Sequence, residues 1–300
     1  MKQLVVLSGK GGTGKTSVTA AFSHLASMDH YGVKVVLADA DVDASNLELV
    51  VGPQKSEPKV FWGGKVAVID QAVCASCGTC HEVCRFDAVY ENDFKYRIDP
   101  IACDGCAACY YQCPEDAIKM EEQIAGEWFQ SESLYGPLFH AALKPGGENS
   151  GKLVTLVKQN ARLLALDNDL DLVLVDGPPG IGCPVISAAS GADLALIVAE
   201  PTAAGTHDMK RVLSTTNHFG IKALVCINKA DIYPEGSRKI FSFCQEQGIE
   251  VVGQIPFDLS VPNAMVKGQA VTAYDPDAKS SRAILEIWEV ILGLLFKEDL

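Results

Sequence analysis

Two motifs able to do chemistry stand out in this chain, one rich in glycine and the other rich in cysteine. Residues 8–16 read SGKGGTGKT and satisfy the pattern G-x₄-G-K-[ST], in which backbone N–H groups close around phosphates. Eight cysteines form two runs of C-x₂-C-x₂-C-x₃-C, a spacing that holds iron–sulfur clusters. We therefore predict one polypeptide that binds both a nucleoside triphosphate and clusters. The cysteines are Cys74, Cys77, Cys80 and Cys84 in the first run, and Cys103, Cys106, Cys109 and Cys113 in the second.

The glycine-rich motif has the setting that phosphate binding requires, because it follows an apolar strand and opens a helix. Lys15 is expected to neutralise the β- and γ-phosphate charge, and Thr16 to ligate Mg²⁺. Asp176 ends another apolar run and is expected to hold a Mg²⁺-bound water, ahead of a loop, Gly177–Gly182, that moves when the γ-phosphate leaves. The predicted phosphate contacts are Gly9, Lys10, Gly11, Gly12, Thr13, Gly14, Lys15, Thr16 and Ser17.

Alternating apolar runs and helical patterns must position these residues. Such runs read as strands buried on both faces, and together with the helical patterns at 15–30 and 206–219 they predict a mostly parallel, doubly wound α/β sheet. Ligands of such sheets bind beyond the carboxyl ends of the strands, where the glycine-rich loop and the acidic motifs lie. The predicted strands are 3–8, 34–39, 171–176, 194–200 and 222–228.

The cysteines lie in an interruption of this pattern, which contains an internal repeat. Residues 69–89 match 98–118 with all four cysteines aligned. The repeat predicts a small inserted α+β domain at 59–125, between nucleotide-domain segments 1–58 and 126–300. It is too small for a substantial apolar core, so we expect its clusters to hold it together. Residues 127–152 are expected to form a long loop with a short helix.

The sequence KGGTGK, with Lys10 directly after Gly9, resembles the deviant Walker A motif of the MinD/ParA/Mrp and nitrogenase iron protein group. The resemblance implies a homodimer in which Lys10 reaches across to the partner's phosphates. Residues 39–47, DADVDASNL, are similar to the first switch of that family. The resemblance then implies that Asp41 orients the attacking water and that Asp39 lies near Mg²⁺, which makes Lys10, Lys15 and Asp41 the catalytic residues.

The base pocket has two interpretations. Asn228 and Asp231 belong to an N-K-x-D pattern by which GTPases read guanine, since an Asp there accepts two hydrogen bonds that adenine cannot supply. The resembling family mostly uses an Asn at this point and backbone contacts to adenine, with residues 255–258 nearby. We favour ATP over GTP and expect Asn228 and Asp231 to contact the nucleotide.

The cysteine runs resemble those of bacterial ferredoxins, in which the fourth cysteine of each run ligates the other cluster. The second run ends in the usual proline, Pro114, whereas the first has Arg85. A zinc site is disfavoured because zinc usually pairs C-x₂-C with distant ligands. The resemblance implies one [4Fe–4S] cluster on Cys74, Cys77, Cys80 and Cys113 and another on Cys84, Cys103, Cys106 and Cys109.

Three cysteines lie outside the runs. Cys226 and Cys244 are expected to be small core residues. Residues 171–182, DLVLVDGPPGIG, are similar to the Walker B motif and second switch of the MinD/ParA/Mrp group, and Gly177–Gly182 is named the second-switch loop below. Cys183 follows this loop, where a dimer would bring two copies together around a bridging cluster, as in the nitrogenase iron protein. That protein supplies two cysteines per subunit, however, and no second candidate is present here, so the bridging cluster is a hypothesis.

Composition excludes several classes of protein. A net charge of −13 argues against a nucleic-acid partner. The sequence contains no run of 18 apolar residues, so we predict no transmembrane helix. The N-terminus lacks the pattern of a signal peptide, and the short cysteine spacings fit metal ligation in a reducing cytoplasm. The apolar stretch 283–296 has no basic face for lipid and is expected to pack on the sheet.

The favoured function is an ATP-hydrolysing dimer whose nucleotide state controls electron transfer through two [4Fe–4S] clusters to a partner protein. The alternative is an ATP-dependent assembly factor or carrier that delivers clusters or a metal cofactor to an acceptor protein. A spatial organiser of the MinD or ParA kind is disfavoured, because the sequence shows no basic surface for DNA or lipid.

Overall fold

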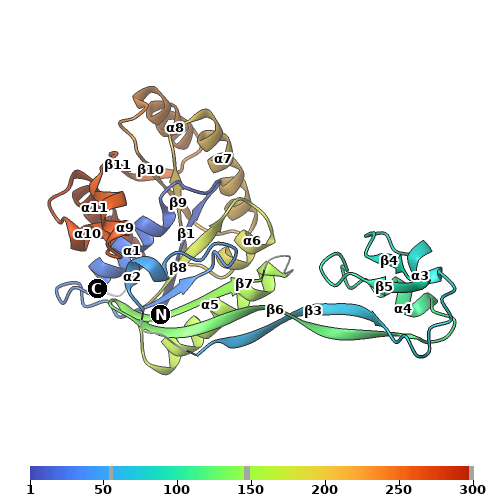
Figure 1. The fold of residues 1–300 in the computed structure, drawn as a ribbon. Helices are drawn as coiled ribbons and strands as arrows, with labels where there is room; N and C mark the ends of the chain where they lie inside the picture. The colour runs from blue at the N-terminus through green and yellow to red at the C-terminus, as the bar shows by residue number, and fades with distance from the viewer. Residues whose placement is uncertain (54–56, 145–148, 297–300) are drawn as a thin grey trace. The chain divides into compact units, whose positions relative to one another are not determined.

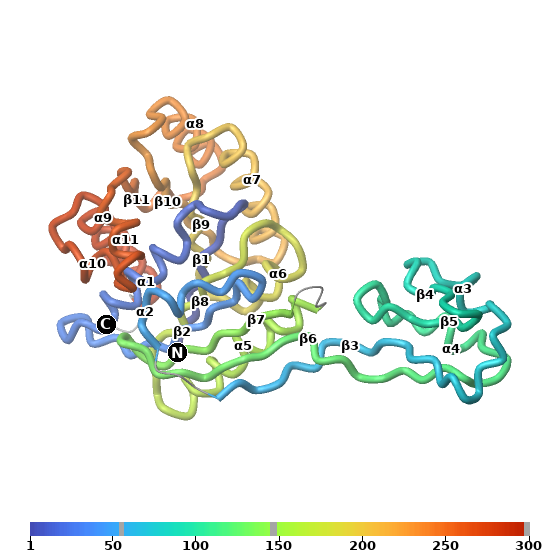
Figure 2. Tube along the Cα trace, in the orientation of Figure 1, coloured from blue at the N-terminus to red at the C-terminus, as the bar shows by residue number. Residues whose placement is uncertain are grey.

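The computed structural model describes residues 1–53, 57–144 and 149–296. The chain divides into two compact units, and the chain trace in Figure 2 passes from the first unit into the second and back. The first unit contains Met1–Lys59, Trp128–Ala142 and Ser150–Leu300, and the second contains Val60–Glu127 and Leu143–Asn149. Among the described residues, no helix is long and apolar enough to cross a membrane.

A mostly parallel sheet forms the centre of the first unit, in the strand order β11-β10-β9-β1-β8-β2-β7. Continuous apolar runs build these strands, and each residue of β2 and β9 is buried, as expected for a sheet covered on both faces. The predicted mostly parallel α/β sheet is therefore confirmed. The parallel strands are β1 (Lys2–Ser8), β2 (Val35–Asp39), β8 (Leu172–Pro179), β9 (Leu194–Ala199), β10 (Ala223–Asn228) and β11 (Glu250–Ile255).

Helices cover both faces of this sheet (Figure 1). On one face, the ring of Phe22 in α1 lies 5.1 Å from that of Trp288 in α11, and Trp288 is fully buried, so the C-terminal helix packs on the core as predicted. Helices α5 to α8 lie on the other face. The helices of this unit are α1 (Lys15–Ala26), α2 (Glu48–Val51), α5 (Ser150–Asp167), α6 (Cys183–Ala189), α7 (Ala203–His218), α8 (Pro234–Glu246), α9 (Ser260–Val266), α10 (Val271–Tyr274) and α11 (Lys279–Phe296).

The long loop predicted for 127–152 is wrong. This part of the chain contains the end of β6 (Ile118–Ser133), all of β7 (Gly136–Leu143) and the start of α5. Only two residues join the strands, so β6 and β7 run antiparallel, whereas β7 pairs in parallel with β2. The glycines and serines of this segment suggested a loop, but its aromatic and apolar residues fit a half-buried sheet, and tertiary packing decided the outcome.

Strands β3 (Lys59–Ile69) and β6 carry the chain into and out of the second unit. Inside that unit, β4 (Val89–Asn92) and β5 (Lys95–Ile98) form an antiparallel hairpin, accompanied by two short helices, α3 (Thr79–Glu82) and α4 (Ala108–Gln112). The hairpin turns at Asp93 and Phe94, which both have positive φ, as a tight two-residue turn requires.

The internal repeat is visible in the burial of equivalent residues of the second unit. Cys80 and Cys109 are 8% and 9% exposed, and Ala88 and Ala117 are both 1% exposed. The backbone conformation repeats as well. Equivalent residues of the two runs share positive φ, namely Ser76 and Gly105, Gly78 and Ala107, and Asp87 and Asp116. The unit therefore consists of two similar halves, whose small buried cluster includes Ala67, Ile69, Cys80, Val89, Cys109 and Ile118.

Candidate functional site

The glycine-rich loop lies between the carboxyl end of β1 and the start of α1, in a cavity of about 640 Å³. Gly14 has a φ of 97°, and a Cβ atom there would collide with the side-chain amide of Asn228, so only glycine fits this turn. The buried hydroxyl of Thr13 has no hydrogen-bond partner within the described residues, which fits a loop that closes around a phosphate group. Lys15 is 5% exposed at the first position of α1.

Two buried carboxylates stand side by side at the strand ends next to this loop. Asp39 of β2 is the register partner of Asp176 of β8, and both side chains are fully buried. The hydroxyls of Thr16 and Thr19 donate to Asp176 at 2.7 and 3.0 Å. Two carboxylates beside a threonine hydroxyl are hard oxygen ligands of the kind that Mg²⁺ prefers, so these residues fit a magnesium–nucleotide site.

Burial and mutual repulsion change the acidity of this pair. Burial and the charge of the neighbouring Asp176 together raise the pKa of Asp39 to about 7, against the hydrogen bonds that its carboxylate accepts. Burial also raises the pKa of Asp176 to about 6, against the opposing charge of Lys15. A cation bound between the two would remove the repulsion, which is a physical reason for two carboxylates to share this position.

Asp39 also organises the segment that follows it. Its carboxylate accepts hydrogen bonds from the hydroxyl of Ser45 at 2.7 Å and from the backbone N–H of Leu47 at 3.0 Å. The N–H groups of Asp41 and Asn46 donate to it at 3.1 Å each. The loop 41–47, named the Asp41 loop below, is therefore fastened to a carboxylate of the phosphate site. Asp41 itself lines the cavity, and burial raises its pKa to about 6.

Glu200, the residue directly after β9, forms ion pairs with two lysines of the site. It pairs with Lys10 at 2.6 Å and with Lys229 at 2.5 Å, and Lys229 also donates to the carbonyl of Gly12 at 3.2 Å. The glutamate side chain is 11% exposed, whereas that of Lys10 is 37% exposed. Sequence reasoning missed Glu200 and Lys229. The signals present in the sequence were the place of Glu200 at the end of the predicted strand 194–200 and the place of Lys229 within the N-K-x-D pattern.

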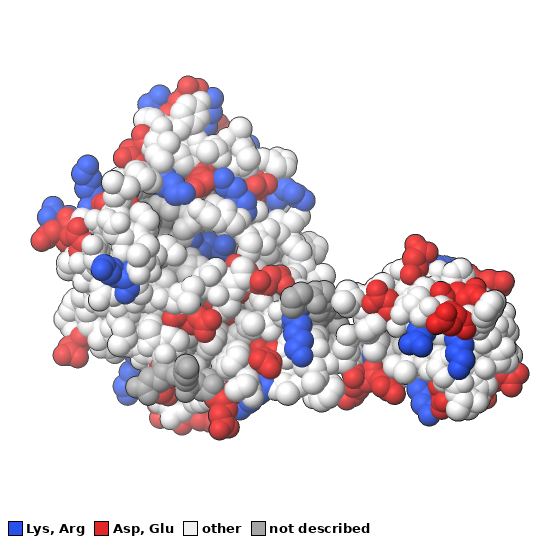
Figure 3. Space-filling view, in the orientation of Figure 1, with Lys and Arg blue, Asp and Glu red and all other residues white. Residues whose placement is uncertain are grey.

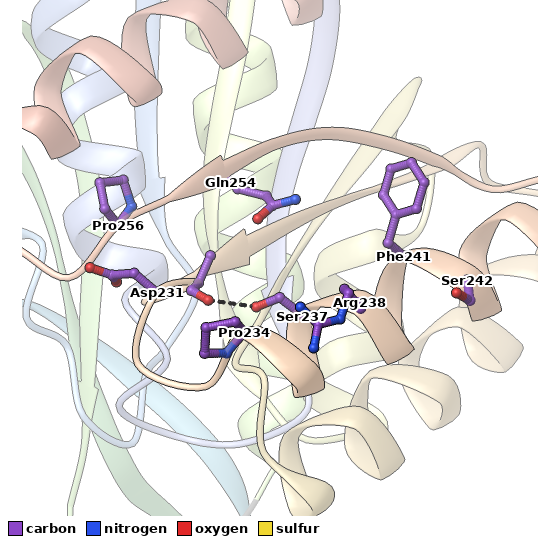
Figure 4. Close-up of a pocket in the computed structure, with 9 residues that line it drawn as sticks. Asp231, Pro234, Ser237, Arg238, Phe241, Ser242, Gln254 and Pro256 are labelled. Atoms are coloured by element: carbon purple, nitrogen blue, oxygen red, sulfur yellow. Dashed lines mark hydrogen bonds between the residues drawn. The ribbon is translucent and has the colours of Figure 1, made fainter.

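The predicted base-contacting residues lie in two different hollows. Asn228 lines the phosphate cavity and donates to the carbonyl of Thr13 at 2.7 Å, and Phe257 lines the same cavity. Asp231 accepts a hydrogen bond from the N–H of Phe257 at 2.6 Å and lines a neighbouring hollow of about 800 Å³ between α8 and β11. Figure 4 shows this second hollow, with Gln254 on the strand and Arg238 on the helix. One Asp231 oxygen is thus already occupied by the chain's own backbone.

Each of two cavities in the second unit is lined by four cysteines. The set around each cavity takes three cysteines from one run and the fourth from the other. Pro114 lines the first cavity, whereas Arg85 is exposed and lines neither. The first cavity has Cys74, Cys77, Cys80 and Cys113, and the second has Cys84, Cys103, Cys106 and Cys109.

These cavities suit a cluster better than a single ion. Within the described ranges, no three His, Cys, Asp or Glu side chains converge to hold one metal ion. Four thiols spread around a cavity match a [4Fe–4S] cluster, in which each sulfur binds a different iron atom. Burial raises the pKa of Cys80 to about 11, so the free thiol is kept protonated until a metal centre replaces its proton.

The three remaining cysteines have different surroundings. Cys226 and Cys244 are fully buried in the first unit, and burial raises the pKa of Cys226 to about 12, as expected for inert core thiols. Cys183 is exposed at the first position of α6, directly after the second-switch loop. A bridging cluster at Cys183 stays a hypothesis.

Lys158 of α5 caps the helix that follows the second-switch loop. It is 5% exposed and donates to the carbonyls of Ser187 and Ser190, near the end of α6. Near the start of α5, a Cβ atom on Gly151 would lie 3.2 Å from the hydroxyl oxygen of the same Ser187. The two helices are therefore fitted closely together.

The buried amine of Lys158 predicts a specific pH dependence of stability. Burial lowers its pKa from 10.5 to about 8, so the folded protein binds fewer protons than the unfolded chain between these values. The free energy of unfolding should therefore gain a contribution as pH rises from about 8 to about 10.5. Urea titrations across this range test it. The contribution should vanish in Lys158→Met; an identical pH slope in the variant would contradict the assignment.

This geometry defines a P-loop nucleoside triphosphatase site, with a lysine in the loop and two carboxylates at neighbouring strand ends. The chain belongs to the CobQ/CobB/MinD/ParA nucleotide binding domain family, whose model matches residues 4–271. It is an ATPase of the MinD/ParA type, as the sequence predicted.

Two relatives match this chain over nearly all of its length. An uncharacterised protein of Methanocaldococcus jannaschii, MJ0578, is 34% identical over 289 residues, which is 96% of this chain and 95% of the relative. An iron–sulfur cluster carrier protein of Pyrococcus horikoshii is 24% identical over 98% of this chain and 86% of its own. The first relative confirms the family, whereas the name of the second belongs to that protein.

Solved structures resemble the fold at low identity. MinD of Pyrococcus horikoshii with Mg-ADP is 18% identical, with a TM-score of 0.58 over 98% of this chain and 96% of that one. MinD of Aquifex aeolicus, in its complex with MinC, is 19% identical, with a TM-score of 0.60 and the same coverage. At these identities the likeness concerns the fold alone.

Charge is distributed unevenly along the chain. Between residues 60 and 127 there are twelve Asp and Glu but five Lys and Arg. On the face drawn in Figure 3, the basic side chains of the described residues are scattered among acidic ones and form no continuous basic surface. An acidic surface of this kind suits a basic protein partner better than a polyphosphate backbone.

Proposed function

We propose that this ATPase couples its nucleotide state to electron transfer through two [4Fe–4S] clusters to a partner protein. The observation that carries the proposal is the second unit's pair of cavities, each lined by four cysteines, in a chain that also has a P-loop site. When bound, such clusters supply one-electron chemistry, at about −400 mV by analogy with ferredoxins. The proposed ligands are Cys74, Cys77, Cys80 and Cys113 for one cluster, and Cys84, Cys103, Cys106 and Cys109 for the other.

The nucleotide side of the proposal rests on the residues around the P-loop. Lys15 and the loop N–H groups bind the phosphates, and Thr16, Asp39 and Asp176 hold Mg²⁺ with its waters. Asp41 lines the cavity and orients the attacking water. Loss of the γ-phosphate would change what Asp39 and Asp41 bind, and so would move the Asp41 loop and the loop after Asp176.

ATP is the proposed nucleotide. Guanine recognition by the N-K-x-D pattern needs a carboxylate that accepts two hydrogen bonds from the base, and one oxygen of Asp231 already accepts from Phe257. Asp231 also lines the hollow next to the phosphate cavity. Competition between ATP and GTP in a hydrolysis assay tests this choice, and a strong preference for GTP would overturn it.

A homodimer is proposed in which Lys10 contacts the partner's phosphates. In the single protomer Lys10 is held by Glu200, so it must leave this ion pair to reach across. We expect Glu200→Gln to lower the concentration of ATP analogue needed for dimerisation by about three- to tenfold, the effect of losing a partly exposed ion pair worth about 1 kcal/mol. Sedimentation velocity measures it.

The matched control for Glu200 is Glu235→Gln. Glu235 also pairs with a lysine, Lys239, but on the exposed surface of α8. This control should dimerise like the wild type. If Glu200→Gln dimerises at the same analogue concentration as the wild type and Glu235→Gln, the ion pair with Lys10 does not restrain dimer formation.

Delivery of clusters to an acceptor protein is the second candidate. One cysteine of each set, Cys77 in the first and Cys106 in the second, is exposed to solvent, which gives an incoming thiol access. Relatives named iron–sulfur cluster carrier proteins support it loosely.

Spectroscopy of the anaerobically purified protein tests both candidates. The EPR spectrum and midpoint potential of the reduced clusters are recorded without nucleotide, with Mg-ADP, and with a non-hydrolysable ATP analogue. A nucleotide-dependent shift supports the redox proposal. Unchanged spectra, with iron passing to an apo-ferredoxin when ATP is added, would replace it with the carrier.

A further inference from the structure

A carboxylate–imidazole–hydroxyl chain, with a partly exposed carboxylate and a buried imidazole and hydroxyl, lies in the first unit, outside the phosphate cavity. Nδ1 of His140 lies 3.0 Å from a carboxylate oxygen of Glu48, and its Nε2 lies 3.0 Å from the hydroxyl of Ser131. The three residues come from three elements, with Glu48 at the start of α2, Ser131 on β6 and His140 on β7. The imidazole stacks on the ring of Phe129, with 4.9 Å between centroids.

The order of these groups is that of a nucleophilic triad, but their burial excludes this chemistry. Ser131 is 5% exposed and His140 is 6% exposed, so no substrate reaches the hydroxyl. A buried imidazole with both nitrogens engaged instead fixes the positions of its partners. The three residues, named the Glu48 relay, therefore join α2 to two strands.

Glu48, at one end of the Glu48 relay, is connected through the backbone to the phosphate site. Glu48 directly follows Leu47, whose N–H donates to the buried carboxylate of Asp39 at 3.0 Å. The Asp41 loop is thus held at one end by Asp39 and continues at the other into α2. A change in what Asp39 binds would therefore act on α2 through these backbone bonds, since α2 is a single short turn that begins directly after Leu47.

The far end of α2 is fastened to the same strands. The N–H of Leu134, in the turn between β6 and β7, donates to the carbonyl of Val51 at 3.0 Å. The first and last residues of α2 therefore both bind the β6–β7 pair, one through a side chain and the other through the backbone. A displacement of α2 has to displace the end of β6 as well.

Strand β6 is continuous with the cysteine-bearing part of the chain. It runs from Ile118 to Ser133 without interruption. Its first residue is 3% exposed and packs in the same small cluster as Cys80 and Cys109, and the N–H of the preceding Ala117 lies 3.3 Å from the sulfur of Cys113. One strand thus begins beside the cysteines and ends at the Glu48 relay.

We propose that Glu48 and His140 are positioning residues that couple the Asp41 loop to strand β6, and so transmit the nucleotide state along β6 toward the cysteine cavities. This inference rests on the proposed coupling between ATP and the clusters, and it names the residues that perform it. Neither residue lines the phosphate cavity, so in this proposal each acts through α2.

Hydrogen–deuterium exchange on the full-length, cluster-loaded protein tests the proposal. Exchange of residues 118–133 is compared without nucleotide and with Mg²⁺ and a non-hydrolysable ATP analogue. The wild type should show a nucleotide-dependent change in this strand. Glu48→Ala should lose that change while keeping nucleotide protection of the P-loop, because Glu48 is partly exposed and its loss leaves no buried charge behind.

Three further variants separate coupling from simple loss of structure. Glu48→Gln keeps an acceptor for Nδ1 and should restore the response, and His140→Phe keeps the stacked ring but should abolish it. Glu132→Ala, on an exposed residue beside Ser131, should respond like the wild type. A response in Glu48→Ala equal to that of the wild type would overturn the proposal.

The wild-type result also separates this inference from the proposed function. If β6 does not respond but the cluster EPR signals shift with nucleotide, the relay is refuted and the coupling stands by another route. If neither responds, the proposed coupling fails, and the inference fails with it.

Discussion

Replacing Cys84 by serine should remove the iron bound by the second cysteine run and leave that of the first run in place. The structure gives the reason, because Cys84 lines the cavity of Cys103, Cys106 and Cys109 and not that of its own run. Iron content should fall from about eight to about four atoms per chain. Iron analysis and EPR of the anaerobically purified variant measure this loss.

The exchange of fourth ligands makes the reciprocal variant informative. Cys113→Ser should remove the signal associated with Cys74, Cys77 and Cys80, whose cavity Cys113 completes. Cys244→Ser is the matched control, since this buried thiol lies on α8, outside both cavities, and should leave iron content unchanged. If Cys84→Ser instead lost the signal that depends on Cys74, Cys77 and Cys80, the runs would bind sequentially and the crossed assignment would be wrong.

Replacing Asp41 by asparagine should lower kcat for ATP hydrolysis by about 10²–10⁴-fold, the range for loss of a group that assists proton transfer. Asparagine has the same shape but no charge, so ATP binding and the Asp41 loop should persist. Steady-state kinetics, with nucleotide affinity measured separately by calorimetry, distinguish the two effects. A change confined to KM would mean that Asp41 binds nucleotide and takes no part in hydrolysis.

Asp43→Asn is the control for this substitution. Asp43 lies two residues further along the same loop and also lines the cavity, but it is exposed. Asp43→Asn therefore changes the net charge near the phosphates by the same amount as Asp41→Asn. A kcat close to that of the wild type would locate the effect at Asp41, whereas equal losses in both variants would attribute it to loop charge.

The parallel sheet could be predicted from sequence because its strands are continuous apolar runs, and a run such as Leu172–Val175 has few other stable environments. The residues of the phosphate site follow from a motif whose spacing carries its own mechanism. The segment 127–143, at the end of β6 and in β7, could not be predicted as strands, because its aromatic residues stand among glycines and serines with no clear period. These strands gain their stability from packing against distant parts of the chain.

The contacts of the site that depend on tertiary structure could not be predicted from the sequence either. Nothing local marks Glu200 as the partner of two lysines, since its neighbours in the chain are apolar residues and a proline. Glu48 is far in sequence from Ser131 and His140, and it meets them only because α2 packs beside the β6–β7 pair. Pairings of this kind need the fold before they can be recognised.

The two similar halves of the second unit have a consequence for how this unit evolved and assembles. Because each cavity takes its fourth cysteine from the other half, a single half has no complete set of four. An ancestral half could have filled a cavity only by pairing with a second copy of itself, so gene duplication would have turned an intermolecular pairing into an intramolecular one. For the same reason, a nascent chain released before Cys113 has been synthesised cannot complete its first cavity.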